Sequence, residues 1–199
     1  LAAQRAAEIQ EVGKDAFLKI SYRDRPDGLL AIAKPMHWGL GDIELSKQPL
    51  IVVVEAIEKP GNLGTILRSA DAVGTDGVIV CDPVTDIYNP NVVRASIGTL
   101  FTRPVVQAGA AQSIEWLREN DFTIVATSPD AAANYTDTNL AGNIAVVMGS
   151  EQYGLSDLWL KQASRRIAIP MLGRADSLNV AMATTLVLYE VLRQRERNA

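Results

Sequence analysis

Residues 50–81 read LIVVVEAIEKPGNLGTILRSADAVGTDGVIVC, and this stretch decides the fold. Its two ends are short apolar runs, at 50–55 and 77–81, which predict strands. The residues between them predict a loop at 56–62 and a helix at 63–73. A strand, a helix and a second strand in this order form the unit from which parallel α/β sheets are built.

The same alternation continues to the end of the chain. Strands are predicted at 105–106, 122–126, 144–148 and 166–169, and helices at 90–98, 111–119, 156–162 and 177–195. Three strands, at 51–54, 78–80 and 145–148, are apolar on both faces, as expected where helices cover both sides of a sheet. The predicted fold class is therefore α/β, a mostly parallel sheet flanked by helices.

The residues before this sheet are less regular. Residues 1–19 have helical character, whereas 21–28 contain Pro26 and Gly28 and predict a linker. The short apolar run at 29–33 predicts one further strand.

The composition indicates one main globular domain. The chain has 199 residues, of which 48% are hydrophobic and 21% charged. It has no apolar run near the roughly 18 residues that a membrane helix needs, and its first twenty residues are too polar for a signal peptide. The formal net charge of −4 does not by itself suggest a nucleic-acid partner.

The rare residue types narrow the chemistry. Cys81 is the only cysteine and lies in an apolar strand, so we predict a buried thiol and a protein of the reducing cytoplasm. His37 is the only histidine, and the sequence has no Cys/His cluster. Neither a zinc site nor a histidine-based catalytic pair is predicted.

In open parallel sheets, ligands bind beyond the carboxyl ends of the strands, and three loops at such positions stand out. The first, residues 58–70, reads EKPGNLGTILRSA; its glycines permit close backbone approach, and its helix N-terminus favours an anion. The spacing of Gly61 and Gly64 fits neither a Walker loop nor a dinucleotide fingerprint. Arg68, about one helical turn beyond Gly64, is placed to reach back over the loop. In a purely structural alternative, Asn62 is an N-cap and Arg68 a solvated helix residue.

The second loop follows the apolar strand at 144–148 and reads GSEQYGL at 149–155. Gly149 and Gly154 predict a tight turn that presents Glu151. The structural alternative is that Glu151 caps the helix beginning near Ser156.

The third loop leads into the last helix and reads PMLGRADSLNV at 170–180. Asp176 or Ser177 is expected to cap that helix, which leaves the amide of Asn179 free in its first turn. The helix is too apolar for a freely exposed element, so it is predicted to be deeply packed or half of a subunit interface. Met182 and Tyr189 are accordingly expected in the core or the interface rather than at a ligand.

Together, the order, spacing and contents of the three loops resemble the SpoU family, also called TrmH, of the SPOUT methyltransferases. The first family motif, Asn-x-Gly-x-Ile-x-Arg-x-Ala, is matched by residues 62–70, the second by 148–155 and the third by 169–180. Residues 89–98 are also similar to a family segment. The resemblance covers about residues 28–195.

The departures from the family are mild. Thr184 and Thr185 stand where alanines are common, and Ala181 stands where a serine is frequent. Residues 13–28 resemble the junction at which many members leave an N-terminal RNA-binding domain. We therefore interpret residues 1–27 as the tail and linker left from such a domain, and residues 28–199 as the SPOUT methyltransferase catalytic domain.

The resemblance implies a deep C-terminal trefoil knot, S-adenosylmethionine as the cofactor without a metal, and a homodimer that pairs through the C-terminal helix region. Eight residues are implied to surround the cofactor: Gly149, Ser150, Leu155, Ile169, Met171, Ser177, Leu178 and Asn179. Five residues are implied in catalysis: Arg68, Asn62, Glu151, Ser177 and Asn179. Arg68 is central, and because its guanidinium stays charged we expect it to act with an RNA phosphate, stabilising the alkoxide or helping the phosphate to take the proton.

The implied function is methylation of a ribose 2′-hydroxyl in RNA by a cytoplasmic enzyme. 23S ribosomal RNA is the favoured substrate, because members that act on transfer RNA are often built differently, and a transfer RNA 2′-O-methyltransferase is the alternative. Three further alternatives stay open: a SPOUT base methyltransferase, a catalytically silent RNA-binding or ribosome-assembly protein, and a generic nucleotide-binding α/β domain. The intact Asn62, Arg68, Glu151 and Asn179 argue against loss of catalysis.

Overall fold

The computed structural model describes residues 8–22 and 25–197 and divides the chain into two compact units, Leu1–Pro35 and Met36–Ala199. In the first unit, the helix predicted at 1–19 is present only as α1, Lys14–Ile20, which buries none of its residues. Residues 8–13 are irregular, and 1–7 lie outside the described residues. The strand predicted at 29–33 is wrong: Leu29 and Ile32 are 87% and 93% exposed, and the segment pairs with no strand of the described chain.

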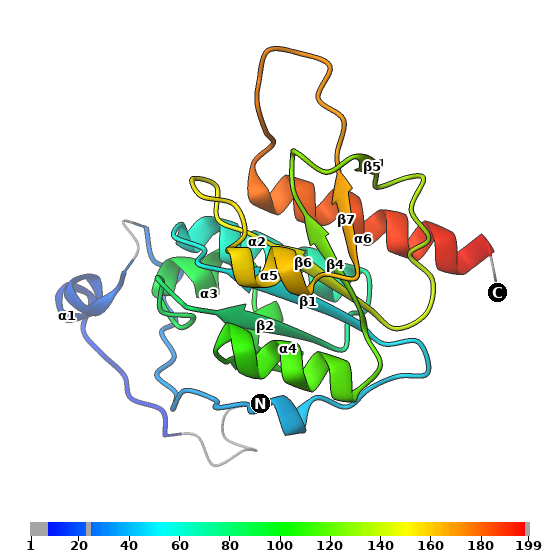
Figure 1. Ribbon diagram of the computed structural model, residues 1–199. Coiled ribbons are helices and arrows are strands. Elements are labelled where there is room, and N and C mark those ends of the chain that lie inside the picture. Colours follow the sequence, from blue (N-terminus) through cyan, green and yellow to red (C-terminus); the bar gives the residue numbers. More distant parts are fainter. Residues whose placement is uncertain (1–7, 23–24, 198–199) are drawn as a thin grey trace. The chain divides into compact units, whose positions relative to one another are not determined.

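The second unit is built on a seven-stranded sheet (Figure 1). Its strands are β1 Leu50–Glu55, β2 Gly77–Cys81, β3 Val105–Gln107, β4 Thr123–Thr127, β5 Ala133–Asn134, β6 Ile144–Met148 and β7 Arg165–Ala168. Their order is β3-β2-β1-β6-β4-β7-β5, and every pair is parallel. The predicted α/β class is confirmed. Only β5 was not predicted, because two residues are too few to show a periodicity.

The strand order creates one switch point at the middle of the sheet. From β1 the chain moves outward through β2 to β3, whereas β4, β7 and β5 lie on the other side of β6. β6 is inserted directly beside β1, with Val54 paired to Met148 at their carboxyl ends. In open parallel sheets this is where ligands bind, because the loops leaving the two strands diverge.

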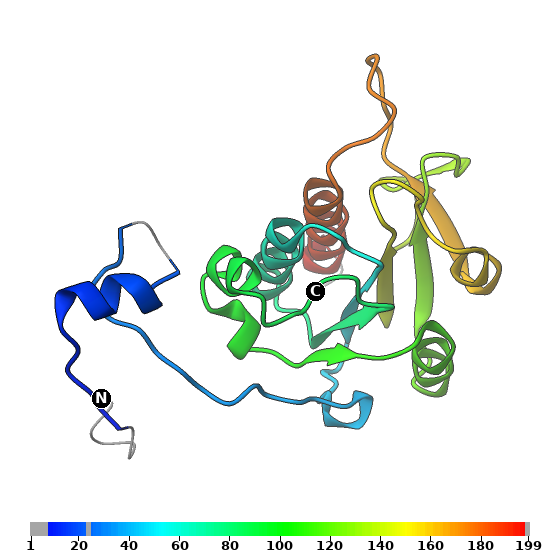
Figure 2. The same ribbon diagram turned by 90° about the vertical axis from the view of Figure 1, so that its left-hand side faces the viewer.

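Helices cover both faces of the sheet (Figure 2). One core contains Val52 and Val54 and packs against α2 Pro60–Ala72, α3 Pro90–Ser96 and α6 Val180–Arg197. The other contains Ile51 and Val53 and packs against α4 Ala110–Glu119 and α5 Asp157–Gln162. Each fully buried aliphatic side chain contributes about 1.5–3 kcal/mol, which is why strands apolar on both faces settle between the two layers.

Gly64 serves helix packing rather than a ligand. A Cβ at this position would lie 2.5 Å from the Cβ of Ala95 and 2.8 Å from the carbonyl oxygen of Val92, both in α3. A Cβ on Gly61, in contrast, would meet nothing within 4 Å. The close backbone approach expected from the glycines of the first loop is therefore made at Gly64, between α2 and α3.

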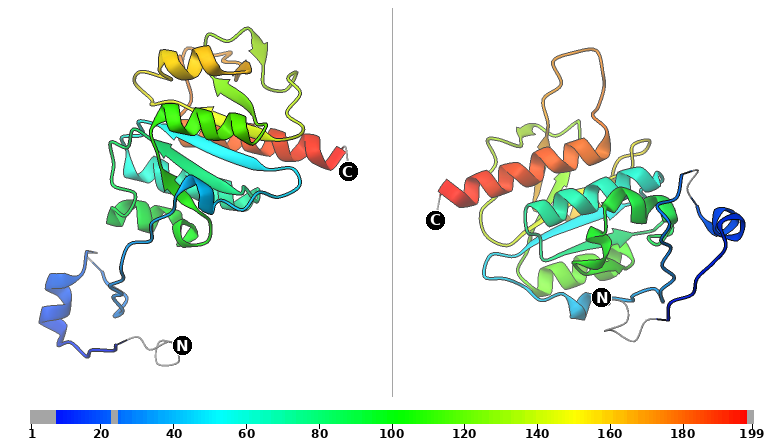
Figure 3. Two further views of the ribbon diagram at one scale, coloured as in Figure 1. Left: turned by 60° about the horizontal axis from the view of Figure 1, so that its bottom comes forward. Right: turned by 180° about the vertical axis from the view of Figure 1, so that it is seen from behind.

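The last helix has one buried and one exposed face, and lies beside α2 (Figure 3). Val187, Leu188 and Val191 are fully buried. Met182 is 65% exposed and Tyr189 49% exposed, so the alternative that places these two side chains in the core of the chain is wrong. The subunit interface and the trefoil knot stay predictions.

Two further expectations concern the thiol of Cys81 and membrane-spanning helices. Cys81 is fully buried in the second core as predicted, and burial raises the pKa of its thiol to about 11, so that it stays protonated at neutral pH. Across residues 8–22 and 25–197, none of the helices combines the length and the apolar content that crossing a bilayer requires.

Candidate active site

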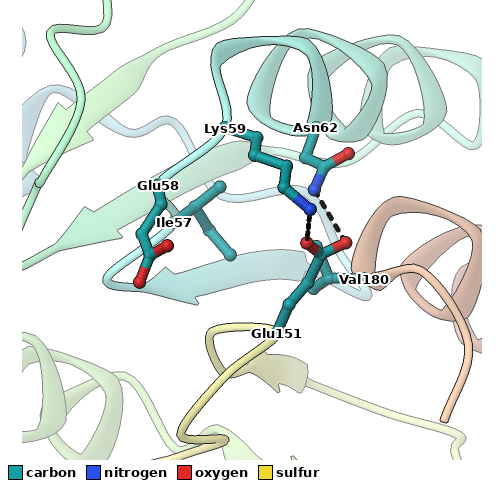
Figure 4. Close-up of a pocket in the computed structure, with 6 residues that line it drawn as sticks. All are labelled: Ile57, Glu58, Lys59, Asn62, Glu151 and Val180. Carbon is teal, nitrogen blue, oxygen red and sulfur yellow. Dashed lines mark hydrogen bonds and ion pairs between the residues drawn. The ribbon is translucent and has the colours of Figure 1, made fainter.

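Three segments far apart in sequence meet beyond the carboxyl ends of β1 and β6. They enclose a small pocket lined by Ile57, Glu58, Lys59, Asn62, Glu151 and Val180 (Figure 4). The first four residues follow β1, Glu151 follows β6, and Val180 begins α6. The pocket therefore lies at the switch point of the sheet, where the sequence places its three loops.

The carboxylate of Glu151 joins these segments. Its Oε1 accepts a hydrogen bond from Nδ2 of Asn62 at 3.0 Å and from Nδ2 of Asn179 at 2.7 Å, and its Oε2 forms an ion pair with Nζ of Lys59. The backbone N–H of Val180 lies near this carboxylate and contributes to lowering its pKa. Nδ2 of Asn179 also donates to Oδ1 of Asn62 at 3.1 Å. Residues from all three predicted loops thus take part in a single hydrogen-bonded cluster.

Asn179 is the N-cap of α6, which corrects two predictions. Its Oδ1 accepts from the backbone N–H groups of Ala181 at 3.1 Å and Met182 at 3.4 Å, the geometry of an N-cap side chain. The helix therefore begins at Val180 instead of Ser177, and neither Asp176 nor Ser177 caps it. The amide nitrogen of Asn179 is free to bond another group, as predicted, and that group is Glu151.

The capping alternatives for Asn62 and Glu151 are wrong, whereas Arg68 is an exposed residue of α2, as its structural alternative states. α2 begins at Pro60, so Asn62 lies within its first turn and its amide nitrogen donates to Glu151 instead of capping the helix. Glu151 does not cap α5 either, because the backbone N–H of Ser156 donates to the buried carboxylate of Glu55 at 2.7 Å. Both polar side chains are turned toward the cluster.

The cluster has a defined charge state. The hydrogen bond and charge of Lys59 lower the pKa of Glu151, with a further contribution from the amide of Asn62. Conversely, Glu151 raises the pKa of Lys59. Both groups are therefore ionised throughout the neutral range. The glutamate carboxylate also lies at the N-termini of α2 and α6, where helix dipoles favour negative charge.

Lys59 was not identified from the sequence. It occupies the N-cap position of α2, where a cation opposes the helix dipole and where its side chain makes no capping bond. Only this unfavourable placement could have pointed to Lys59 in the sequence, because a cation there needs a partner elsewhere in the fold. The partner, Glu151, is 92 residues further along the chain.

The loop after β6 is held by its own backbone. Ser150 and Gly154 exchange two N–H···O bonds of 3.1 Å each, and Oγ of Ser150 accepts from the N–H of Tyr153 at 3.0 Å. A Cβ on Gly149 would lie 2.2 Å from the carbonyl carbon of Gly154. Leu155 is buried in the second core. Of the predicted cofactor residues in this loop, Ser150 and Leu155 thus turn their side chains into the protein.

The loop between β7 and α6 differs in kind. In the described chain, residues 169–178 make no hydrogen bond to other backbone groups or to side chains. Ile169 and Met171 are half-buried, whereas Ser177 and Leu178 are exposed. Uncommitted N–H and C=O groups beside apolar side chains suit an adenosine, whose base needs both. The loop therefore fits the adenosine part of S-adenosylmethionine.

Arg68 and Ser177 are not part of the Glu151 cluster. Arg68 is exposed on α2, and within the described residues it makes no hydrogen bond or ion pair. It follows Asn62 by six residues, a rotation of about 600° around the helix, so the two side chains leave the helix in directions about 120° apart. The free guanidinium is available to a partner outside the chain.

Comparison with known proteins identifies the family and the fold. Residues 49–189 match the model of the SpoU rRNA Methylase family. The chain belongs to this family. The resemblance seen in the three sequence motifs is confirmed, and the mostly parallel SPOUT sheet with it.

Relatives within the SpoU family cover most of the chain. A solved RNA 2′-O ribose methyltransferase is 41% identical, with a TM-score of 0.83 over 94% of this chain and 72% of that one. The AdoMet-bound rRNA methyltransferase of Sinorhizobium meliloti is 33% identical, with a TM-score of 0.91 over 96% of this chain and 74% of that one. The 23S rRNA (uridine(2479)-2′-O)-methyltransferase of Streptomyces viridochromogenes is 33% identical over 178 residues, which are 86% of this chain and 62% of that protein.

Proposed function

We propose that this SpoU family member transfers the methyl group of S-adenosylmethionine to a ribose 2′-hydroxyl of RNA, and that its substrate is 23S ribosomal RNA. The observation that carries the proposal is the cluster of Asn62, Glu151 and Asn179, in which the three SpoU motifs meet at the switch point of the sheet. Two relatives are 2′-O-methyltransferases by name, which supports the ribose hydroxyl as acceptor. The Streptomyces relative supports 23S RNA.

The proposed cofactor site lies between the two C-terminal loops. It comprises the eight residues Gly149, Ser150, Leu155, Ile169, Met171, Ser177, Leu178 and Asn179. The tight loop after β6 offers a fixed wall, since its Ser150–Gly154 backbone pairing is already made. The loop before α6 offers free backbone groups for the adenosine. The AdoMet-bound relative from Sinorhizobium supports this cofactor.

The chemistry needs alignment and removal of one proton. S-adenosylmethionine, when bound, supplies an activated methyl group. The protein must bring the 2′-oxygen into line and stabilise the charge that develops as its proton leaves. Arg68 is charged, exposed and without a partner in the described chain, so it suits an RNA phosphate next to the reacting ribose. Asn62 would orient the ribose, while Glu151 and Ser177 would hold the loops in register.

A homodimer would complete this site. The exposed side chains Met182, Leu186 and Tyr189 follow one another at helical spacing along α6 and are 65%, 42% and 49% exposed. Such an apolar stripe favours pairing with the same stripe of a second copy. We further propose that the enzyme is cytoplasmic. Residues 1–27 would be the tail and linker left from an RNA-binding domain, and residues 28–199 the catalytic domain.

The test is methyl transfer by the purified protein. We would incubate it with S-adenosylmethionine and either 23S ribosomal RNA or transfer RNA, and map modified nucleosides by mass spectrometry. A ribose-methylated nucleoside in 23S RNA is expected. A methylated base would replace the proposal with a base methyltransferase, methylated transfer RNA would change the substrate, and RNA binding without methylation would indicate a silent binding protein.

Arg68→Ala sharpens the test. We expect turnover to fall by at least about a thousandfold while cofactor binding stays within about twofold, because the arginine acts on the RNA. Arg118→Ala, on α4 at the other face of the sheet, is the matched control and should keep wild-type turnover. Retained turnover in Arg68→Ala contradicts the role of this residue.

A further inference from the structure

Lys59 has an unusual position for a lysine. It is the N-cap residue of the 13-residue helix α2, where its cation opposes the helix dipole. Its side chain is 67% exposed, yet Nζ is directed at the carboxylate of Glu151 (Figure 4). An exposed ion pair contributes little to stability, so stability alone does not explain the lysine.

The two oxygens of Glu151 divide their partners between them. Oε2 is held by Lys59, while Oε1 accepts both amides, from Asn62 at 3.0 Å and from Asn179 at 2.7 Å. A carboxylate is one rigid planar group, so fixing Oε2 sets the direction in which Oε1 points. The contact made by Lys59 thus decides where the two amides find their common acceptor.

We propose that Lys59 is a positioning residue for methyl transfer, which fixes the Glu151 carboxylate so that Asn62 and Asn179 are held in one arrangement. This rests on the proposed methyltransferase function. The orientation passes along the cluster: Oδ1 of Asn179 is committed to the first turn of α6, and Oδ1 of Asn62 accepts from Asn179. Without Lys59 the carboxylate of Glu151 can rotate. Asn62 at the start of α2 and Asn179 at the start of α6 then no longer share an acceptor in a fixed position.

The pH dependence of turnover reports on this arrangement. The charged groups that line the pocket around Glu151 are Lys59 and Glu58, and the segment of α6 that borders it, Val180, carries no charge. Lys59 is the main cause that lowers the pKa of Glu151. If Lys59 is removed, the carboxylate protonates at higher pH, and the acid limb of the kcat profile moves to higher pH.

The experiment measures kcat, KM for RNA and for S-adenosylmethionine, and the pH profile in three variants of the full chain. Lys59→Met should lower kcat about tenfold or more, since small misplacements in a site are costly, and should shift the acid limb upward. Lys59→Arg keeps the cation and should restore most of kcat. Lys161→Met removes another exposed lysine in an ion pair, with Asp157 on α5, and should behave as wild type.

A double variant separates positioning from a direct role. Because Lys59 acts through Glu151, Lys59→Met should cost nothing further in a Glu151→Gln background. Additive losses, or a Lys59→Met variant whose only change is a raised KM for RNA, overturn the proposal and indicate direct RNA binding. An active wild type whose Lys59→Met variant keeps kcat and its pH profile also overturns the role of Lys59. A wild type that transfers no methyl group overturns the proposed function itself.

Discussion

The loop after β6 and the loop before α6 both belong to the proposed cofactor site, but they are built in opposite ways. The first, residues 149–155, is closed by a pair of backbone hydrogen bonds between Ser150 and Gly154 and by the close contact of Gly149 with the Gly154 peptide. The second, residues 169–178, is bonded to nothing else in the described chain and exposes Leu172 to 99%. The first loop supplies fixed geometry, and the second supplies free groups that a ligand can satisfy.

Hydrogen exchange should show the largest difference between the loops. The amides of Ser150 and Gly154 each donate to a backbone carbonyl at 3.1 Å and should be protected at least about a hundredfold. The amides of residues 172–178 have no acceptor in the described chain and should exchange near the rate of an unfolded peptide. Adding S-adenosylmethionine should slow exchange in the second loop and leave the first nearly unchanged. Protection of the second loop without ligand would contradict the contrast, as measured by NMR.

Adding a methyl group to each loop should give the next largest difference, in the free energy of unfolding. Gly149→Ala places a Cβ 2.2 Å from the Gly154 carbonyl carbon, so backbone must move, and we expect a loss of about 1–3 kcal/mol of unfolding free energy. Gly173→Ala is the matched control in the second loop, where a Cβ meets nothing within 4 Å, and should change stability by less than about 0.5 kcal/mol. Urea denaturation measures both. Equal losses would show that the loops are equally constrained.

Within the segment that leads into α6, substitutions at Asn179 and Ser177 should differ in their effect on stability. Asn179→Ala removes the N-cap of α6 and two amide bonds, so the unfolding free energy should fall by about 1 kcal/mol. Ser177→Ala, two residues earlier at an exposed position, should leave stability within about 0.5 kcal/mol while lowering methyl transfer. Thermal unfolding combined with the methylation assay checks both. A stable Asn179→Ala protein would mean that another group caps α6.

The ion pair between Glu151, in the loop after β6, and Lys59 should have the smallest effect on stability. The pKa of Glu151 is lowered in the folded state, so its contribution is present above the ordinary value of 4.5 and is lost as pH falls below it. The pKa of Lys59 is raised, so its contribution is lost as pH rises beyond the ordinary 10.5. Glu151→Gln should therefore lower Tm by no more than about 2 °C at neutral pH, and by less at low pH or in 1 M salt. A Tm difference that grows toward low pH would contradict this sign.

The fold was largely readable from the chain because its strands are unusually uniform. β1, β2 and β6 were predicted with the boundaries that the structure shows, since runs such as 144–148 are apolar on both faces and bounded by turn residues. The run at 29–33 carries the same apolar signal but forms no strand, because the signal cannot say whether a neighbouring strand is present. Helix starts were predicted less well, and α6 begins three residues later than expected.

The site was predicted in its members but not in its connections. Asn62, Glu151 and Asn179 follow from their motifs, and the structure joins them. The ion pair of Lys59 could not be inferred, since it joins residues far apart in the chain, and the capping role of Asn179 was missed because Asp176 and Ser177 also suit an N-cap. Arg68 was placed on its helix correctly, yet the structure leaves it without a partner in the described residues.

The sequence by itself determined the alternation of strands and helices, the positions of three polar loops beyond strand ends, and through their motifs the family. These are local properties, because periodicity and motif spacing depend only on residues close together in the sequence. Only the tertiary structure decided that β6 inserts beside β1, and with it that the three loops share one carboxylate. Strand order depends on the packing of whole layers, and the partners of Glu151 depend on strand order.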